Sequence, residues 1–176
     1  MLKDVFHFSF TVSDVEQSVR WYRDVLGLEL VHRQRQENDY TRTLVGMRDA
    51  VLEVAQFKIR DVSPSLSTHM LELVEYVTPK GGRPELQTNQ IGSAHICFVV
   101  PDITEEYERL LSRGVRFCNP PVEIAAGVNR GGRACYFSDP DGITLELHEP
   151  PPHRKQALGL DNANATTFEM TRRTNS

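Results

Sequence analysis

The sequence predicts an α+β fold built from two tandem βαβββ modules, and three observations support this prediction. First, strand-like segments with alternating apolar and polar residues occur in the same order in both halves of the chain. Second, each half has one segment with helical spacing of apolar residues directly after its first strand. Third, the first-strand histidine and the helix-ending glycine are 27 − 7 = 20 residues apart in one half and 114 − 95 = 19 in the other. Such a repeat indicates a duplicated structural unit.

Module 1 is expected to span residues 1–78 and to begin with a strand. The segment VFHFSFTV alternates strictly, with aromatic residues on one side and His7 on the other. In the following helical segment, SDVEQSVRWYRDVLG, Ser13 and Glu16 form a capping-box pattern and Gly27 is a typical helix end. The segments LELVHRQ, AVLEVAQFKI and HMLELVEYV favour strands, and the ambiguous DYTRTLVGM between the first two suits a short helical turn.

Module 2 is expected to span residues 92–149, after a linker at 79–91 that is rich in Gly, Pro and polar residues. It repeats the order of module 1: SAHICFVV as a strand, PDITEEYERLLSRG as a helix capped by Asp102, and VRFCNPPVEI, RACYFSD and ITLELHE as strands. Residues 150–176 are expected to form an extended or disordered tail, or to lie across a partner subunit.

Composition excludes several classes of function. The 176 residues are 39% apolar with a net charge of −4, so a sizeable core is expected and no basic surface favours nucleic acid or an anionic membrane. The apolar runs are too short to span a bilayer, and the N-terminus does not resemble a signal peptide. Three cysteines without a Cys-x-x-Cys pair fit free thiols in a reducing compartment. We therefore expect a cytoplasmic protein whose partner is a small molecule.

A Leu-Glu-Leu triplet occurs once in each half and places an acid, Glu72 or Glu146, inside an apolar run. Since the two leucines of each triplet share one face of a strand, the glutamate takes the other face. The same alternation turns His7 and His95 away from the face that packs on the helices. If the two sheets curve together, these four side chains converge in one cleft.

Two imidazoles and two carboxylates form a mixed N/O donor set that suits a divalent ion such as Mn, Fe, Co, Ni or Zn. A cation would also remove the cost of burying a carboxylate. The spacing is uneven, because His7 and Glu72 are 72 − 7 = 65 residues apart and His95 and Glu146 are 146 − 95 = 51 apart. Glu53 is therefore a rival third ligand, although the surroundings of Glu72 better mirror those of Glu146.

The chain resembles the vicinal oxygen chelate superfamily, which includes glyoxalase I, methylmalonyl-CoA epimerase, extradiol dioxygenases, and fosfomycin- and bleomycin-resistance proteins. The resemblance covers about residues 5–149 and rests on FHFSFTV and AHICFVV, LELVEY and LELHEP, WYRDVLGLEL and YFSDPDGITLEL. It implies the glyoxalase/bleomycin resistance/dioxygenase fold, in which paired modules form a curved sheet around a metal cleft. It also implies a homodimer, and a divalent metal (Mn, Co, Ni, Zn or Fe) on His7, Glu72, His95 and Glu146.

By this resemblance, a fourth protein ligand is the pattern of glyoxalase I and, in related form, of the epimerase. Both remove a proton next to a carbonyl, with the metal polarising the oxygen and a carboxylate moving the proton. The resemblance thus implies a metal-dependent lyase, isomerase or epimerase with Glu72 or Glu146 as the base. Asp49 falls near the place of a second acid in the epimerase and is a further candidate catalytic residue.

Other classes of function stay open. His7, His95 and Glu146 alone would match the two-His, one-Glu set of an Fe(II) ring-cleaving dioxygenase. A small-molecule binding or resistance protein of the bleomycin type generally lacks the metal set. A thiol transferase of the fosfomycin type is a further alternative, for which Glu72 is unexpected.

Three residues are candidates for contacts with the substrate. Arg130 and Arg133 in GVNRGGRACYF could bind an anionic group, with a solvated loop as the equal alternative. His148 shares the face of Glu146, either as a support of the site or as a rim residue. By alternation Cys97 also faces the cleft, although a packed thiol is the simpler interpretation.

Overall fold

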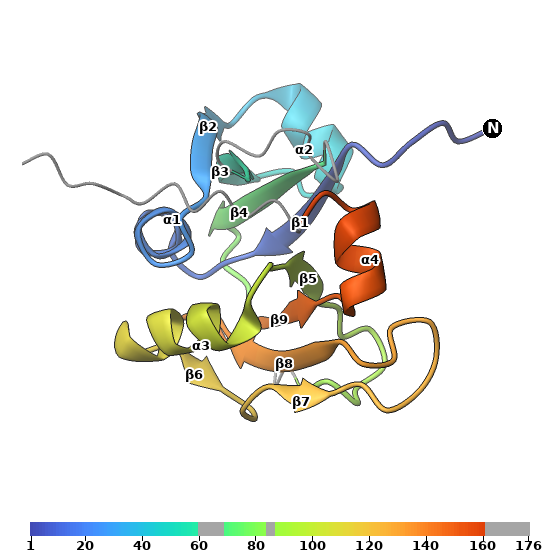
Figure 1. The fold of residues 1–176 in the computed structure, drawn as a ribbon. Coiled ribbons are helices and arrows are strands. Elements are labelled where there is room, and N and C mark those ends of the chain that lie inside the picture. The colour runs from blue at the N-terminus through green and yellow to red at the C-terminus, as the bar shows by residue number, and fades with distance from the viewer. Residues whose placement is uncertain (60–68, 84–86, 161–176) are drawn as a thin grey trace, which may run out of the picture.

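The computed structural model describes residues 1–59, 69–83 and 87–160, which form two modules stacked one above the other (Figure 1). Module 1 contains β1 (His7–Thr11), α1 (Val15–Asp24), β2 (Glu29–Gln36), α2 (Asp39–Val45), β3 (Val51–Lys58) and β4 (Met70–Thr78). Module 2 contains β5 (Ile96–Val99), α3 (Ile103–Ser112), β6 (Arg116–Phe117), β7 (Val122–Glu123), β8 (Arg133–Ser138) and β9 (Thr144–Glu149), followed by α4 (Pro152–Ala157).

The two sheets have corresponding strand orders, β1-β4-β3-β2 and β5-β9-β8-β6, with β7 paired to β8. In each sheet the first and last strands of the module are parallel neighbours, and the other pairs are antiparallel. This arrangement confirms the predicted α+β fold. Within the described residues no hydrogen-bonded ladder joins the two sheets, and β1 and β5 are the edge strands that face each other (Figure 1).

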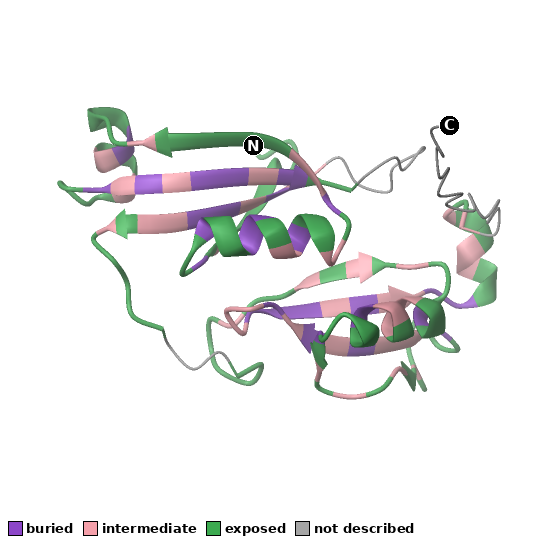
Figure 2. Ribbon diagram, turned by 90° about the vertical axis from the view of Figure 1, so that its left-hand side faces the viewer, coloured by how far each residue is buried: buried purple, intermediate pink, exposed green. Residues whose placement is uncertain are grey.

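One apolar core spans both modules and lies on the face of each sheet that α1 or α3 covers (Figure 2). Leu71 and Leu73 of β4 belong to it, as do Leu145 and Leu147 of β9. Both leucine pairs therefore face the helices, as the alternation predicts. Part of the aromatic face of β1 lies outside the core, because Phe6 and Phe8 are exposed and only Phe10 and Val12 pack against it.

The two long helices start in the same way. Asp14 caps α1 by accepting from the backbone N–H of Gln17, and Asp102 caps α3 by accepting from Thr104 and Glu105. The predicted capping box of Ser13 and Glu16 is therefore wrong. The reason is tertiary: the backbone N and Oγ of Ser13 both donate to Asp141, which lies in the other module.

A second acid supports each helix start from the last strand of the same module. Glu75 of β4 accepts from the backbone N–H of Val15 at 2.9 Å, and Glu149 of β9 accepts from Ile103 at 3.1 Å. A carboxylate at this position is favourable because it satisfies a free N–H and faces the positive end of the helix dipole. The repeat between the modules thus extends to the glutamates that support the start of each helix.

The joint between the modules contains a buried carboxyl group, Asp139. Its Oδ2 accepts from the Tyr22 hydroxyl at 3.1 Å, and its Oδ1 accepts from the N–H groups of Asp141 and Ile143. Burial raises the pKa of Asp139 above its ordinary value. Burial together with the Asp139 charge raises the pKa of Tyr22 well above its ordinary value. Arg109 also crosses the joint and donates to the carbonyl oxygen of Val25.

Two segments differ from their predictions. VRFCNPPVEI forms two short strands, β6 and β7, because the prolines at 120 and 121 cannot donate to a ladder. Residues 152–157, expected to be part of an extended tail, form α4. This helix is fixed by Arg154, which donates to Asn129, and by Lys155, which donates to the carbonyl oxygen of Pro101 at 2.7 Å. The rest of the predicted tail, 161–176, lies outside the described residues.

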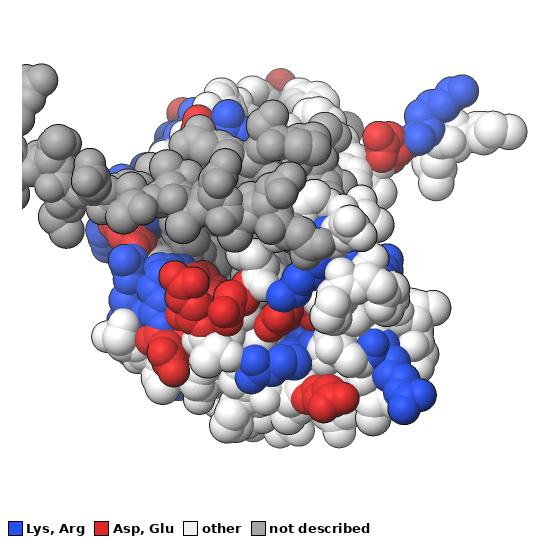
Figure 3. All heavy atoms as spheres, in the orientation of Figure 1, with Lys and Arg blue, Asp and Glu red and all other residues white. Residues whose placement is uncertain are grey.

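Surface charge and helix length relate to the expectation that neither nucleic acid nor a membrane is a partner. On the face shown in Figure 3, basic and acidic side chains lie next to one another and do not form one large patch of a single sign. None of the helices in the described part of the chain is both long and apolar enough to cross a membrane.

Candidate functional site

His7 and Glu72 form a pair on the face of the module 1 sheet that is turned away from α1. Ser9 of β1 lies opposite Glu72 in the parallel register, and His7, two residues earlier, lies on the same face of the sheet. The distance from His7 Nε2 to Glu72 Oε1 is 3.6 Å. The other carboxylate oxygen, Oε2, accepts from Gln56 Nε2 at 2.8 Å, because Gln56 of β3 is the antiparallel partner of Glu72.

His95 and Glu146 form the matching pair in module 2, with 3.1 Å between His95 Nε2 and Glu146 Oε2. Cys97 lies opposite Glu146 on β5, and Tyr136 lies opposite it on β8. Desolvation, followed by the charge on Glu146, raises the pKa of the Cys97 thiol to about 12, so the thiol is a hydrogen-bond donor at neutral pH. The Tyr136 ring packs edge-on against His95 with 5.2 Å between the ring centroids. Desolvation raises the pKa of the Tyr136 hydroxyl.

The spacing within each pair suits two ligands of one divalent ion. Two donor atoms that are each about 2.1 Å from an ion are about 3.0 Å apart at an octahedral angle and about 3.4 Å apart at a tetrahedral one. The observed separations of 3.1 Å and 3.6 Å are close to these values. In both pairs the glutamate is the more buried partner, and the histidine is about two-fifths exposed.

The structure does not gather the two pairs into one cluster. Across residues 1–59, 69–83 and 87–160, no group of three or more His, Cys, Asp and Glu side chains is arranged to hold a metal ion. Each pair comes from one module, and in the described part of the chain β1, which carries His7, is not hydrogen-bonded to β5, which directly follows His95. The donor types and the spacing within each pair therefore fit a divalent ion, whereas the four-ligand set is not assembled.

The rival ligand Glu53 lies on the other face of the module 1 sheet. It is opposite Glu75 in the β3–β4 register and pairs with Arg35 at 2.9 Å. Asp49 precedes β3 at the end remote from Gln56, and the strand from Val51 to Gln56 alone spans about 16 Å. The structure thus brings neither Glu53 nor Asp49 beside the histidine–glutamate pair.

The candidate substrate contacts of module 2 are distributed over both faces. His148 lies on the same face as Glu146, two residues further along β9. Arg133 lies on the helix-covered face, where it donates to Thr104 Oγ1 at 2.7 Å. Arg130 is exposed in the loop before β8, and its backbone N–H donates to Gly127. Of the three, only His148 shares a face with the pairs.

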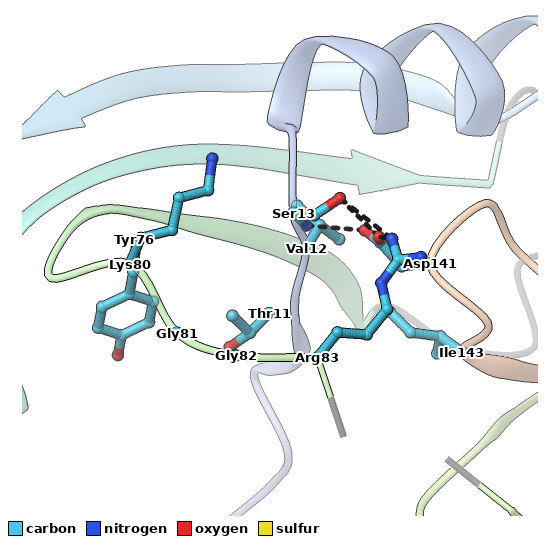
Figure 4. A pocket seen from close by; sticks show the side chains of 10 residues that line it. All are labelled: Thr11, Val12, Ser13, Tyr76, Lys80, Gly81, Gly82, Arg83, Asp141 and Ile143. Atoms are coloured by element: carbon cyan, nitrogen blue, oxygen red, sulfur yellow. Dashed lines mark hydrogen bonds and ion pairs between the residues drawn. The ribbon is translucent and has the colours of Figure 1, made fainter. Parts of the chain in front are cut away.

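Sequence reasoning missed Gln56 and Tyr136, which contact the two pairs from equivalent neighbouring strands. Their position depends on the register between strands, which a single sequence does not reveal. It also missed a cavity at the linker, lined in part by Lys80 and Arg83 (Figure 4). The Gly-Gly sequence between two basic residues was the available signal.

Comparison with known proteins identifies the class. The family model described as the Glyoxalase/Bleomycin resistance protein/Dioxygenase superfamily matches residues 5–147, so the chain belongs to this superfamily. Members of this superfamily bind small molecules, and many are metal-dependent enzymes.

Two curated proteins and one crystal structure illustrate what the chain is similar to. A 2-epi-5-epi-valiolone epimerase from Actinomyces sp. is 32% identical over 151 residues, which cover 84% of this chain and 79% of the relative. A lactoylglutathione lyase from Pseudomonas aeruginosa is 28% identical, over 80% of this chain and 79% of the relative. The crystal structure of a glyoxalase family protein from Bacillus cereus superposes with a TM-score of 0.71 at 23% identity, over 86% and 96% of the two chains.

Proposed function

We propose that this protein is a divalent-metal-dependent enzyme that moves a proton next to the carbonyl group of a small oxygenated metabolite. The observation that carries the proposal is the repeated histidine–glutamate pair, with ligand-like spacing in both modules. The names of the two relatives, an epimerase and a lyase, support an epimerase, isomerase or lyase reaction.

In this proposal the two pairs, His7 with Glu72 and His95 with Glu146, would have to come together around one ion, which would supply a Lewis acid that polarises the substrate carbonyl. Gln56 holds one oxygen of Glu72 and leaves the other turned towards His7, so Glu72 is oriented to stay a ligand. Among the described residues no side-chain amide donates to Glu146, which lies next to a thiol and an aromatic ring. We therefore assign to Glu146 the removal and return of the proton.

The metal is tested by elemental analysis of the purified protein beside three variants. Glu72→Ala and His95→Ala each remove one ligand, and Glu53→Ala is the matched control because it removes an acid from the opposite face of the same sheet. We expect about one Mn, Co, Ni, Zn or Fe per active site in the wild type and in Glu53→Ala, and loss of the metal from the other two. Absence of metal from the wild type, even after reconstitution, would contradict the proposal.

The reaction is tested by following exchange of the substrate proton with D₂O by NMR. The substrates to screen are 2-epi-5-epi-valiolone, hemithioacetals of 2-oxoaldehydes, and 2-substituted acyl thioesters. We expect Glu146→Gln to abolish exchange while leaving the fold unchanged, because an amide cannot accept the proton. Exchange at the wild-type rate in Glu146→Gln would assign the base elsewhere.

The same variants separate the alternative functions. Iron retained in Glu72→Ala and lost from His95→Ala, together with oxygen consumption in the presence of a catechol, would indicate the three-ligand dioxygenase instead. Tight ligand binding by protein that contains no metal would indicate a binding or resistance protein. We also propose that the protein is cytoplasmic and forms a homodimer. Sedimentation equilibrium of the full chain tests the dimer.

A further inference from the structure

A row of four side chains crosses the sheet of module 2 next to the histidine–glutamate pair. Val99 of β5, His148 of β9, Ala134 of β8 and Val122 of β7 are successive cross-strand neighbours. Strands β5, β9 and β8 lie side by side, and β7 pairs with β8 (Figure 1). These four residues form the His148 row. His148 is two residues beyond Glu146 on β9, so the row lies about 7 Å from the glutamate.

The His148 row lies on the sheet face that carries the histidine–glutamate pair, the site face. On β5, Phe98 and Val100 pack against the apolar core that spans both modules, so Val99 between them points to the other face. On β9 and β8, the neighbouring residues Leu147 and Cys135 are members of the same core. The row is therefore turned away from α3 and towards the candidate site.

The row combines exposed apolar surface with one unused hydrogen-bonding group. Val99 and Val122 are 40% and 54% exposed, and in the described part of the chain neither packs against an apolar cluster. His148 is half-buried, and its side chain makes no hydrogen bond or ion pair with a described residue. None of the four residues is a lysine or an arginine. A ligand would thus meet two valines, an alanine and a free imidazole.

Module 1 closes the equivalent place with its own side chains. Val74 is two residues beyond Glu72 on β4, and Val54 lies opposite Val74 on β3. These valines are only 9% and 2% exposed, and Val45 of α2 packs against their cluster. Module 2 has no helix at this point of the repeat, because β6, β7 and β8 follow one another in the chain. The duplicated fold therefore leaves open in module 2 a place that module 1 fills.

We propose that the His148 row is a specificity subsite for a neutral, hydroxylated ring ketone. The C–H face of the ring covers Val99 and Val122, and a hydroxyl group across the ring from the carbonyl bonds to His148, because an imidazole can donate and accept. A row without a cation is a poor match for a substrate with an anionic far end. This assignment rests on the proposed function for the reacting carbonyl group.

Three matched ring ketones test binding: 4-hydroxycyclohexanone, cyclohexanone, and 4-oxocyclohexanecarboxylate, which carries an anion in place of the hydroxyl group. The valine methyl resonances of the full chain are followed by ¹H–¹³C NMR during titration with each. With 4-hydroxycyclohexanone we expect saturable shifts at Val99 and Val122 and none at Val54, the covered equivalent in module 1. We expect cyclohexanone to bind about fivefold more weakly, because it cannot bond to His148, and the carboxylate to bind more weakly than the hydroxy ketone.

Variants of the row separate its two contributions. His148→Ala should weaken 4-hydroxycyclohexanone about fivefold and cyclohexanone less than twofold, and His148→Gln should restore most of the difference because an amide also donates and accepts. Val122→Ser should weaken both ketones to the same extent. His32→Ala is the matched control, because His32 is an exposed histidine of module 1 that lies opposite Gln56, and it should bind as the wild type does.

Several outcomes would overturn the subsite. Absence of saturable shifts at Val99 and Val122 would mean that the row does not contact the ketone. Shifts that follow protein concentration instead of ligand would assign the row to a contact between copies of the chain. Equal affinities of the wild type for the hydroxy ketone and cyclohexanone, or tighter binding of the carboxylate, would contradict the substrate class.

The subsite and the proposed function fail in different ways. If the hydroxy ketone binds as expected but none of the protons next to its carbonyl exchanges with D₂O in the metal-loaded enzyme, the proposed function fails and the subsite remains. If exchange occurs with the same KM in the wild type and in His148→Ala, the proposed function remains and the subsite fails.

Discussion

The two modules share a framework but differ in the residues that surround it. Each presents a histidine from its first strand and a glutamate from its last strand, 3.6 Å apart in module 1 and 3.1 Å apart in module 2. Each also supports the start of its helix with a second glutamate three residues further along, Glu75 or Glu149. The repeat therefore preserves the backbone plan and the acids that depend on it.

The surroundings of the two glutamates in the candidate site are different. Glu72 is held by the amide of Gln56, whereas Glu146 lies between the thiol of Cys97 and the ring of Tyr136. The amide donor fixes one oxygen of Glu72, whereas Glu146 lies closer to its own histidine than Glu72 does. The difference teaches that a duplicated fold can keep two symmetric histidine–glutamate pairs and still surround the two carboxylates with different side chains.

The largest expected effect concerns the joint that holds the two modules together. Asp139→Ala leaves the Tyr22 hydroxyl and two backbone N–H groups without their acceptor, and should lower the free energy of unfolding by about 2–4 kcal/mol. Tyr22→Phe removes only the hydroxyl and should cost about 1 kcal/mol. Urea unfolding measures the free energy of unfolding of both variants. Equal decreases in the two variants would show that the Asp139 carboxyl group contributes no more than its hydrogen bond to Tyr22.

The second prediction sharpens the comparison of the helix supports. Glu149→Ala leaves the mostly buried Lys155 without its acid and should cost about 2–3 kcal/mol, whereas Glu75→Ala leaves only the exposed Lys80 and should cost about 1 kcal/mol. Thermal and urea unfolding compare the two. An equal decrease in unfolding free energy in Glu75→Ala and Glu149→Ala would mean that the two lysine–glutamate ion pairs contribute equally to stability.

The third prediction separates the two sets of surroundings. Gln56→Leu frees Glu72 from its amide partner and should weaken metal binding about tenfold, as is usual for loss of a residue that orients a ligand. Tyr136→Phe keeps the ring against His95 and should change metal affinity less than threefold. Competition with a chelator of known affinity measures the metal affinity of both variants. A larger decrease in affinity in Tyr136→Phe than in Gln56→Leu would mean that the surroundings of Glu146, and not those of Glu72, orient the ligands.

The smallest expected effect is a pH dependence of stability at the joint. Burial raises the pKa of Asp139 above its ordinary value of 3.8, more than its hydrogen bonds lower it. The folded state therefore binds the proton more tightly than the unfolded state, so the contribution to stability is full below pH 3.8 and is lost as the pH rises through the folded-state pKa. The difference in unfolding free energy between wild type and Asp139→Asn should fall across this window and be level above it. A difference that rises with pH would contradict the direction.

Much of the fold followed from local patterns in the sequence. The alternation in FHFSFTV and in the two Leu-Glu-Leu triplets assigned the faces of β1, β4 and β9, and the structure confirms that the leucines pack on the helices. Asp102 as a cap followed from the same kind of local evidence. These features were accessible because strand alternation and helix capping depend on neighbours within a few residues.

The remaining features depended on contacts between residues distant in the chain. Only the register of β3 and β8 places Gln56 beside Glu72 and Tyr136 beside Glu146, and only the packing of the modules turns Ser13 from a helix cap into a partner of Asp141. The sequence by itself determined which side chains share a face, because that is set by the two-residue period of a strand. Tertiary structure decided which of them meet across strands and modules, because pairing and docking depend on the summed packing of segments far apart in sequence.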